Sequence, residues 1–287
     1  MNKKPIVAGI GELLWDMLPT GRQLGGAPCN FAFHAMQAGC ESYAISAVGR
    51  DDPGNELIET LIQLGLSDQY IQKNNYPTST VTIKIDEHGH PDYTIHENVA
   101  WDHIQWNAQI MALAGKLDAV CFGSLAQRNH ESEQTVLSLI SATKPDCLKV
   151  FDINLRQHYY TKDIIVQSII RSDVLKLNDD ELPVVAAFTQ LSGDIRSQLT
   201  GLVNKMKLEY IVYTMGSRGS IIVSANEYSF IEAPRVTVAD TVGAGDAFTA
   251  AFIAGILNGQ PLSEVHQKAT DIAAWVCTQK GATPRNH

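Results

Sequence analysis

The chain has 287 residues, of which 45% are apolar and 18% are charged, values typical of globular proteins. These proportions exclude intrinsic disorder, a collagen-like fibre and a charge-laced coiled coil. With 22 basic and 31 acidic residues the formal net charge is −9, which argues against nucleic acid as the main partner because phosphate contacts need lysine and arginine.

From the N-terminus, short apolar runs alternate with helical patterns. They predict a strand at 6–10, a helix at 30–38, a strand at 43–48, a helix at 54–64, a strand at 117–122, a helix at 132–141, a strand at 148–153, a helix at 162–170, strands at 174–177 and 210–214 separated by a helix at 194–205, and a helix at 246–257. This alternation indicates an α/β fold with a mostly parallel sheet covered by helices on both faces. Ligands of such sheets bind beyond the carboxyl ends of the strands.

The segment 79–95 departs from this alternation. Residues 79–85 alternate apolar and polar side chains, 87–92 are turn-like, and 93–95 resume an extended run. The pattern predicts a hairpin with one solvent-facing side. Three interpretations stay open: a lid, a dimer contact or an edge hairpin without a function.

Cysteine usage and the apolar runs predict the cellular compartment. The five cysteines are widely spaced, and no C-x-x-C pair occurs, so we expect reduced, buried thiols and neither a disulfide framework nor a zinc site. The apolar run at 5–11 is followed by Glu12 and Asp16, so we expect no signal peptide, and no run approaches the length of a membrane span. We therefore expect a cytoplasmic protein with neither nucleic acid nor membrane as partner.

The segment 240–249 carries the strongest chemical pattern. Gly243, Ala244 and Gly245 directly precede a long helical pattern, so their backbone amides can converge on one point, where the helix N-terminus adds positive potential. This predicts an anion hole for a phosphoryl group or an oxyanion. Asp246 lies beside it. The alternative, that Asp246 only caps the helix, leaves the three small residues unexplained.

The helix N-terminus is expected to lower the pKa of Asp246 and make it a weak base. A weak base is sufficient for transferring a phosphoryl group to an alcohol, because the transition state is loose and the hydroxyl proton can leave late.

The segment 25–30 forms a second candidate site. Gly25 and Gly26 allow the backbone to approach a ligand closely, and Asn30 can both donate to and accept from a sugar hydroxyl. Asp16, just after the first strand, can accept two hydroxyl hydrogen bonds. The alternatives are a simple turn for the glycines and a surface carboxylate for Asp16. No G-x-G-x-x-G follows the first strand, so a dinucleotide site is not indicated.

The chain resembles the ribokinase-like, or PfkB, family of carbohydrate kinases. Residues 25–54, from Gly25-Gly-Ala-Pro-Cys-Asn30 to Ala47-Val-Gly-Arg-Asp-Asp-Pro-Gly54, match its N-terminal signature, and 240–248 match its C-terminal signature. Gly11-Glu12, Asp16 and 25–28 are most similar to the fructokinase branch. The resemblance implies one ribokinase-like domain over 1–287, with a small β-sheet lid formed by 12–24 and 79–100.

The resemblance also implies an activity, the ATP-dependent phosphorylation of a sugar hydroxyl, with fructose as the first candidate. Asp246 would be the catalytic base, and the amides of Gly243, Ala244 and Gly245 would hold the transferring phosphoryl group. The implied sugar-binding residues are Asp16, Gly25, Gly26 and Asn30, with Arg156 of the 152–156 D-x-N-x-R segment as a further candidate for substrate or phosphate charge. A surface position is the alternative for Arg156.

Three further segments are implied to bind the nucleotide and ions. Asn178 and Glu181 match an N-x-x-E motif that organises Mg²⁺ through water, although an Asn cap with an acidic first turn would give the same pattern. The T-x-G-x-x-G loop along the ATP phosphates would contain Thr214, Gly216 and Gly219. Asp240 and the 281–282 turn fall where the family often binds a monovalent cation such as K⁺.

The lid is implied to close over the sugar and exclude water, and in related proteins lid strands form a homodimer contact. Several alternatives remain open. A nucleoside kinase would use Trp15, Tyr93 and Trp101 as a slot for the base. A 2-keto-3-deoxygluconate kinase would use Arg156 or Arg22. A non-catalytic regulator should lack Asp246 or the glycines, which are intact.

Two remaining features favour structural interpretations. Cys29 in the glycine-rich segment is expected to be a packed small residue. The histidines at 88, 90, 96 and 103 are expected to belong to a solvated turn, because a metal site would need them on one face.

Overall fold

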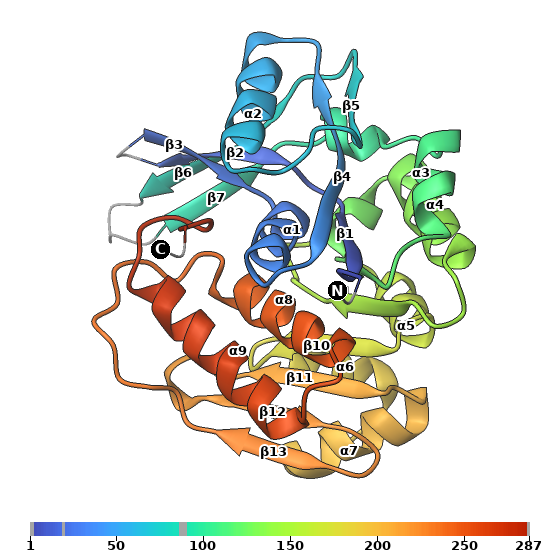
Figure 1. Cartoon of the computed structure of the whole chain (residues 1–287), viewed down its shortest axis with the longest axis vertical. Helices are drawn as coiled ribbons and strands as arrows, with labels where there is room; N and C mark the ends of the chain where they lie inside the picture. Colours follow the sequence, from blue (N-terminus) through green and yellow to red (C-terminus); the bar gives the residue numbers. More distant parts are fainter. Residues whose placement is uncertain (1–2, 19–20, 86–90, 286–287) are drawn as a thin grey trace.

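The main sheet of the computed structural model, which describes residues 3–18, 21–85 and 91–285, places nine strands in the order β13-β12-β11-β10-β9-β8-β1-β4-β5 (Figure 1). The strands are β1 (Ile6–Ile10), β4 (Glu41–Gly49), β5 (Ile71–Asn74), β8 (Ala119–Phe122), β9 (Leu148–Asp152), β10 (Val174–Asn178), β11 (Tyr210–Thr214), β12 (Ser220–Val223) and β13 (Tyr228–Ile231). The pairs from β5 through β11 are parallel, and β12 and β13 continue the sheet antiparallel. The predicted α/β fold with a mostly parallel sheet is confirmed.

Helices cover both faces of the main sheet. One face carries α1 (Ala27–Gln37), α2 (Asp52–Gln63), α8 (Ala244–Leu257) and α9 (Leu262–Cys277), and the other carries α3 (Ala108–Ala114), α4 (His130–Ala142), α5 (Lys162–Ile170), α6 (Leu182–Thr189) and α7 (Ile195–Met206). Successive side chains of β1 point to opposite faces, so that Val7 packs in the cluster with α1 and α8, while Ala8 and Ile10 pack in the cluster on the other side. Because both faces of β1 are buried, its sequence is a continuous apolar run.

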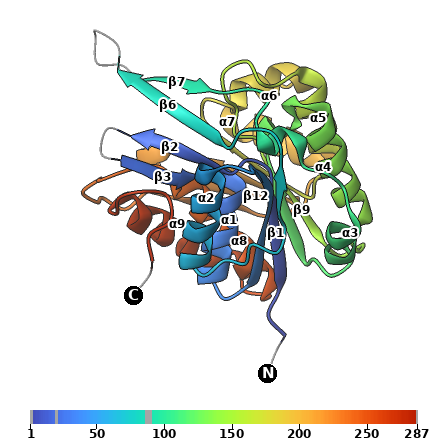
Figure 2. The ribbon, with the colours of Figure 1, turned by 90° about the horizontal axis from the view of Figure 1, so that it is seen from above.

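A second sheet has the strand order β3-β2-β6-β7 and projects to one side of the main sheet (Figure 2). Its strands are β2 (Leu14–Leu18), β3 (Gly21–Gly25), β6 (Ser79–Ile85) and β7 (Pro91–Ile95). The predicted hairpin is confirmed as the antiparallel pair β6–β7. Residues 91 and 92, predicted as turn, are instead strand, and 86–90 lie outside the described residues. We call these four strands the lid sheet.

The lid sheet ends earlier than expected, at Ile95 and not at residue 100. Asn98 has a left-handed backbone (φ 56°), and the 3₁₀ turn η1 (Ala100–His103) follows, so the chain leaves the strand direction there. The remaining predicted helices and strands occur within a few residues of their expected bounds. The sequence patterns did not predict β5, β12, β13, α3, α6 or α9.

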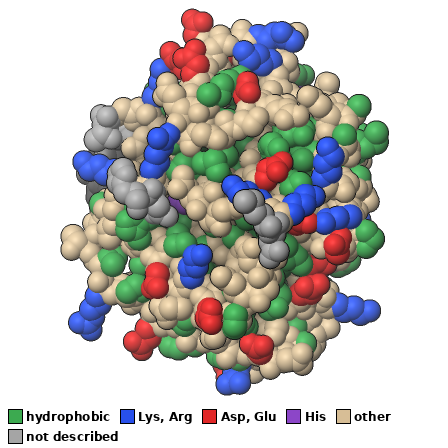
Figure 3. All heavy atoms as spheres, viewed as in Figure 1, with side chains coloured by type: hydrophobic (Ala, Val, Ile, Leu, Met, Phe, Trp, Pro, Cys, Tyr) green, Lys and Arg blue, Asp and Glu red, His purple; other side chains and the backbone are tan. Residues whose placement is uncertain are grey.

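Four of the five cysteines are buried, as predicted, and Cys277 is partly exposed. The five cysteines are free, and burial raises the pKa of the Cys29 thiol to about 12. No helix of the described residues is long and apolar enough to cross a membrane. On the face shown in Figure 3, basic and acidic side chains are interspersed, and the described residues form no continuous basic area there.

Candidate active site

The first turn of α8 presents the residues of the predicted anion hole. Gly243 is the N-cap with a left-handed backbone (φ 80°), and a Cβ at this position would lie 2.5 Å from the carbonyl oxygen of Ala282. Only glycine therefore fits the turn that opens the helix. The N-cap makes no side-chain hydrogen bond, and Asp246 is three residues further on. The alternative that Asp246 is merely the cap is therefore wrong.

Asp246 contacts the predicted sugar-binding segment directly. Its Oδ2 accepts a hydrogen bond of 2.8 Å from Nδ2 of Asn30, which lies in α1 and is 3% exposed. Burial, and then the charge of Asp152, raise the pKa of Asp246 to about 7. The expectation of a lowered pKa is therefore wrong, because desolvation and a neighbouring carboxylate outweigh the helix N-terminus. Asp246 is a considerably stronger base than the sequence indicated.

Three buried ionisable residues that sequence reasoning did not select surround Asp246. Nζ of Lys176 lies 3.0 Å from Oδ1 of Asp152, and both side chains are less than a tenth exposed. Glu12 is also buried, and its Oε1 accepts the backbone amide of Ala27 at 3.2 Å. One sequence feature could have revealed this cluster, namely the lysine inside the apolar run 174–177. A lysine in a buried strand needs a charged partner, because burying an unpaired ammonium is costly.

The lid sheet contributes Asp16 on β2, which packs against Gly25 on the neighbouring strand β3. A Cβ at Gly25 would lie 2.2 Å from Oδ2 of Asp16, so the absence of a side chain there makes room for the carboxylate. Burial raises the pKa of Asp16 to about 6, while the charge of Arg156 opposes this and that of Asp240 adds to it. The predicted residues Asp16, Arg156 and Asp240 are therefore close enough to interact.

Arg156 lies on an exposed loop after β9 in which Asn154 and Gln157 both have left-handed backbones (φ 47°). Its Nη1 donates to the carbonyl oxygen of Leu155 at 3.0 Å. Burial raises the pKa of Glu12, and the charge of Arg156 opposes this increase. The side chain of Arg156 is exposed, as the alternative of a surface position predicted. Its positive charge nevertheless affects the pKa values of Asp16 and Glu12 in the candidate site.

Asn178 and Glu181 bind each other's backbone. Oδ1 of Asn178 accepts the amides of Asp180 and Glu181, and Oε2 of Glu181 accepts the amide of Asn178 at 2.8 Å. Oε1 of Glu181 accepts the amide of Leu155 at 2.9 Å, and the residue is 3% exposed. These bonds close a turn ahead of α6, whose N-cap is Glu181 and whose first turn contains no acidic residue, so the alternative of an Asn cap with an acidic first turn is wrong. The bond to Leu155 also ties the Arg156 loop to the end of β10.

The described residues contain no group of three or more His, Cys, Asp or Glu side chains arranged to hold a metal ion. Both oxygens of Glu181 already accept backbone amides, so this carboxylate suits an ordering role toward water better than direct ligation. Such a donor set fits Mg²⁺, which keeps most of its waters and binds mainly through phosphate oxygens.

The predicted phosphate loop follows β11. Thr214 ends the strand, Gly216 and Gly219 have positive φ angles, and a Cβ at Gly219 would lie 2.1 Å from the carbonyl oxygen of Ile231. Arg218 in this loop pairs with Asp179 at 2.6 Å. The loop is thereby fastened to the turn that contains Asn178.

Asp240 meets the 281–282 turn as expected. Its Oδ2 accepts the amide of Gly281 at 3.1 Å and its Oδ1 the amide of Val242 at 3.1 Å. The carbonyl oxygen of Ala282 is bound by Nε2 of His34 at 2.8 Å. The two candidate cation-binding segments are therefore adjacent.

Several residues named for alternative substrates lie elsewhere. Trp15 is 5% exposed and its Nε1 donates to the carbonyl oxygen of Pro53, while Trp101 is fully buried. Neither can form a slot for a nucleoside base, and the side chain of Tyr93 is outside the described part of the structure. Of the histidines, 88 and 90 are also outside it, and His103 pairs with Glu131 at 2.7 Å.

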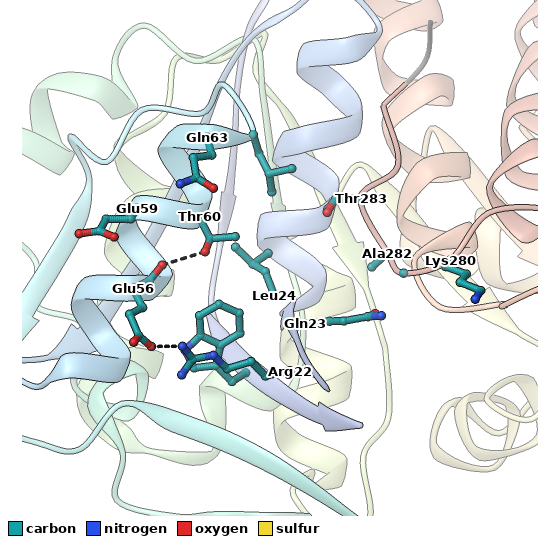
Figure 4. A pocket seen from close by; sticks show the side chains of 13 residues that line it. Arg22, Gln23, Leu24, Glu56, Glu59, Thr60, Gln63, Lys280, Ala282 and Thr283 are labelled. Carbon is teal, nitrogen blue, oxygen red and sulfur yellow. Dashed lines mark hydrogen bonds and ion pairs between the residues drawn. The ribbon is translucent and has the colours of Figure 1, made fainter. Parts of the chain in front are cut away.

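Arg22 faces away from Asp16, because the two residues lie on opposite faces of the lid sheet. Cζ of Arg22 lies 4.8 Å from the centre of the Trp15 ring, and the guanidinium pairs with Glu56 of α2. All three residues line a pocket of about 540 Å³ (Figure 4). The expectation that Arg22 meets the substrate carboxylate is therefore wrong.

Comparisons with known proteins find relatives over nearly the whole length of the chain. A model of the pfkB family of carbohydrate kinases matches residues 19–287. A fructokinase of Klebsiella pneumoniae is 30% identical over 292 residues, which cover 95% of this chain and 93% of that protein.

Solved structures give the same result. The structure of a sugar kinase of Pyrococcus horikoshii in complex with ATP has a TM-score of 0.83 and 26% identity, covering 96% of this chain and 94% of that one. A ribokinase of Thermotoga maritima shares the fold, with a TM-score of 0.79 and 18% identity over 98% of this chain and 95% of that one. The fold is therefore ribokinase-like, and the chain belongs to the pfkB family of carbohydrate kinases.

Proposed function

We propose that the chain transfers the γ-phosphoryl group of ATP to a hydroxyl of a sugar, and that the sugar is fructose. The single observation that carries the proposal is the hydrogen bond between Asn30 and Asp246. It joins the predicted sugar-binding segment to the base beside the anion hole, which is the arrangement that an in-line transfer to an alcohol requires. The similarity to the Klebsiella fructokinase supports the choice of sugar.

In this proposal the sugar hydroxyl lies against Asp246, with other hydroxyls bound by Asp16 and Asn30. Asp246 accepts the hydroxyl proton as the sugar oxygen attacks phosphorus. The amides of Gly243, Ala244 and Gly245 stabilise the charge on the transferring group, because these residues lie at the N-terminus of α8, where the helix dipole is positive. The raised pKa of Asp246 matches this role near neutral pH.

Nucleotide and ions occupy the side of the site formed by the ends of β10 and β11. Thr214, Gly216 and Gly219 border the phosphates of ATP, and Asn178 with Glu181 orders water on Mg²⁺. When bound, Mg²⁺ neutralises phosphate charge during the transfer. The contact between Asp240 and Gly281 would frame a monovalent cation such as K⁺.

The lid sheet supplies Asp16 and covers the sugar. Closure of the lid sheet would exclude water, which would otherwise accept the phosphoryl group in place of the sugar. We propose that the four strands of the lid sheet move together in this step, because β2 pairs with both β3 and β6 and β6 pairs with β7.

A second substrate, 2-keto-3-deoxygluconate, is favoured by one observation. The charge of Arg156 reaches Asp16 and Glu12, so a substrate carboxylate could bind beside it.

The test is ADP release by the purified protein with ATP and Mg²⁺ and, separately, fructose, ribose, 2-keto-3-deoxygluconate, adenosine or no acceptor. Fructose-dependent release supports the proposal, and dependence on 2-keto-3-deoxygluconate, lost in Arg156→Ala, supports the second candidate. If no acceptor stimulates release, the proposed function is wrong.

A further inference from the structure

A lysine lies in the centre of the main sheet, where lysine is rarely found. Lys176 is the third residue of β10, with apolar neighbours on both sides in the chain, and it is 7% exposed. Burying an ammonium group is costly unless a charged partner compensates the lost hydration. Charged side chains held at such positions frequently serve the function of the protein.

The position of the Lys176 ammonium is fixed from two sides. In the register of the parallel strands Lys176 lies opposite Asp152 of β9, and the two side chains form the 3.0 Å ion pair described above. On the other side, a Cβ at Gly245 would lie 3.2 Å from Nζ of Lys176. The ammonium therefore lies beneath the first turn of α8, next to Gly245, the residue that precedes the base Asp246.

The surroundings of Asp246 are otherwise acidic or neutral. Asp152 and Asp246 line the same small cavity of about 10 Å³, together with Asn154 and Cys121. The groups that face Asp246 or interact with it from the elements packed around it are Glu12, Cys29, Asn30, Cys121, Asp152 and Lys176. Glu12 and Asp152 disfavour a charge on Asp246, whereas Lys176 favours it.

We propose that Lys176 is a positioning residue for phosphoryl transfer, whose ammonium, held by Asp152 beneath the first turn of α8, favours the ionised form of the Asp246 carboxylate, which takes the hydroxyl proton. The inference rests on the proposed function of Asp246. In the step, a bond forms between the sugar oxygen and phosphorus, and the bond from phosphorus to the leaving oxygen of ADP breaks. The hydroxyl proton moves to Asp246, and Lys176 keeps its own protons throughout.

The sharpest comparison is between Asp152→Asn and the double variant Asp152→Asn/Lys176→Met. These two proteins differ only in the charge and shape at position 176, and neither contains a carboxylate at 152 that would be left without its partner. The pH at which kcat/KM falls to half its maximum on the acidic side should be about one unit higher in the double variant. The double variant lacks the positive charge of Lys176, and such a charge lowers the pKa of a nearby carboxyl by about one unit or more. Because Asp152→Asn also removes the group that holds the ammonium, the single variant Lys176→Met is compared with the wild-type protein as well. Coincident pH profiles in both comparisons would overturn the inference.

A second readout does not depend on turnover. The carboxyl carbon of Asp246 can be titrated by NMR in protein labelled at aspartate, with its signal identified by its loss in Asp246→Asn. The midpoint should be higher in the double variant than in Asp152→Asn, in parallel with the shift of the kcat/KM profile. Equal midpoints in two folded variants would show that Lys176 is only structural.

The two readouts separate this inference from the proposed function. If the wild-type protein phosphorylates no sugar of the panel, the proposed function fails, while the titration of Asp246 still decides whether Lys176 controls its charge. If sugar turnover is normal and the two titrations coincide, the proposed function stands and the role of Lys176 is refuted.

Discussion

Nδ2 of Asn30 donates a hydrogen bond of 2.8 Å to Oδ2 of Asp246, although 216 residues separate them in the chain. The contact brings the N-terminus of α8 against α1, and with it the anion hole against the segment that contains Gly25 and Gly26. A buried amide that holds the base in place gives Asp246 one defined orientation toward a substrate hydroxyl.

Replacing the base should abolish catalysis without abolishing sugar binding. Asp246→Asn keeps the size of the side chain but cannot take a proton, so kcat should fall by about 10²–10⁴-fold. The affinity for the sugar, measured by calorimetry without ATP, should change little because Asp16 and Asn30 remain. A variant with near-normal turnover would contradict the assignment of Asp246.

The pH dependence of the wild-type enzyme should reflect the raised pKa of Asp246. Because this pKa is about 7 and the ionised form is the base, kcat/KM should rise with pH through about 7 and level off above it. Below the midpoint the rate should fall about tenfold for each pH unit. Initial rates from pH 5.5 to 9 at saturating ATP test this, and a flat profile between pH 5.5 and 7 would show that Asp246 is already ionised there.

The space left by Gly25 should control sugar affinity. Gly25→Ala would place a Cβ at 2.2 Å from Oδ2 of Asp16, so the carboxylate must move away from its present position. We expect KM for the sugar to rise at least about tenfold while KM for ATP stays unchanged, since a lost hydrogen bond to a charged group costs about 1.5–3 kcal/mol. The matched control is Gly115→Ala, where no atom lies within 4 Å of the added Cβ. An equal effect of both changes would contradict the prediction.

An ion pair at the base of the lid sheet should contribute strongly to stability. Nε of Arg128 lies 2.8 Å from Oδ1 of Asp102, with side chains 6% and 2% exposed, and the guanidinium lies between the rings of Trp101 and Tyr159. Arg128→Ala would leave Asp102 buried without its cation, at a cost of about 3–5 kcal/mol in the free energy of unfolding. Urea unfolding measures this directly.

The control for Arg128 is the exposed pair of Arg218 and Asp179, at 61% and 39% exposure. Arg218→Ala should lower the free energy of unfolding by less than about 1 kcal/mol, because solvent screens exposed charges. If the two variants lose equal stability, burial is not what makes the Arg128 pair strong.

Much of this fold could be predicted because its strands are buried on both faces. Continuous apolar runs identified β1, β8 and β11, and period-two alternation identified the hairpin β6–β7. Strand β12 (Ser220–Val223) is also a buried, mostly apolar run, but it is only four residues long. Other missed elements lack such patterns: β13 (Tyr228–Ile231) is at the sheet edge and only partly buried, and α9 alternates small, polar and apolar residues over sixteen positions. Their structure depends on tertiary packing more than on local pattern.

The site could be predicted only in part, for a related reason. Asn30 and Asp246 could be selected from the sequence because they follow glycine-rich segments. Such segments mark places where the backbone can approach a ligand closely. The pKa shift of Asp246 was predicted in the wrong direction. Burial and the charge of Asp152, which raise this pKa, arise only when α1, β9 and α8 pack together in the folded protein. Likewise, the partner of Lys176 became clear only when β9 and β10 were aligned in register.

The distance along the chain between Asn30 and Asp246 has a consequence for synthesis on the ribosome. Strand β1 lies between β4 and β8, so the first strand made cannot complete its pairing until residue 122 has emerged. The predicted anion hole follows only with α8, which begins at Ala244. A nascent chain therefore carries the predicted sugar-binding residues Asp16 and Asn30 long before the groups proposed for phosphoryl transfer have been synthesised.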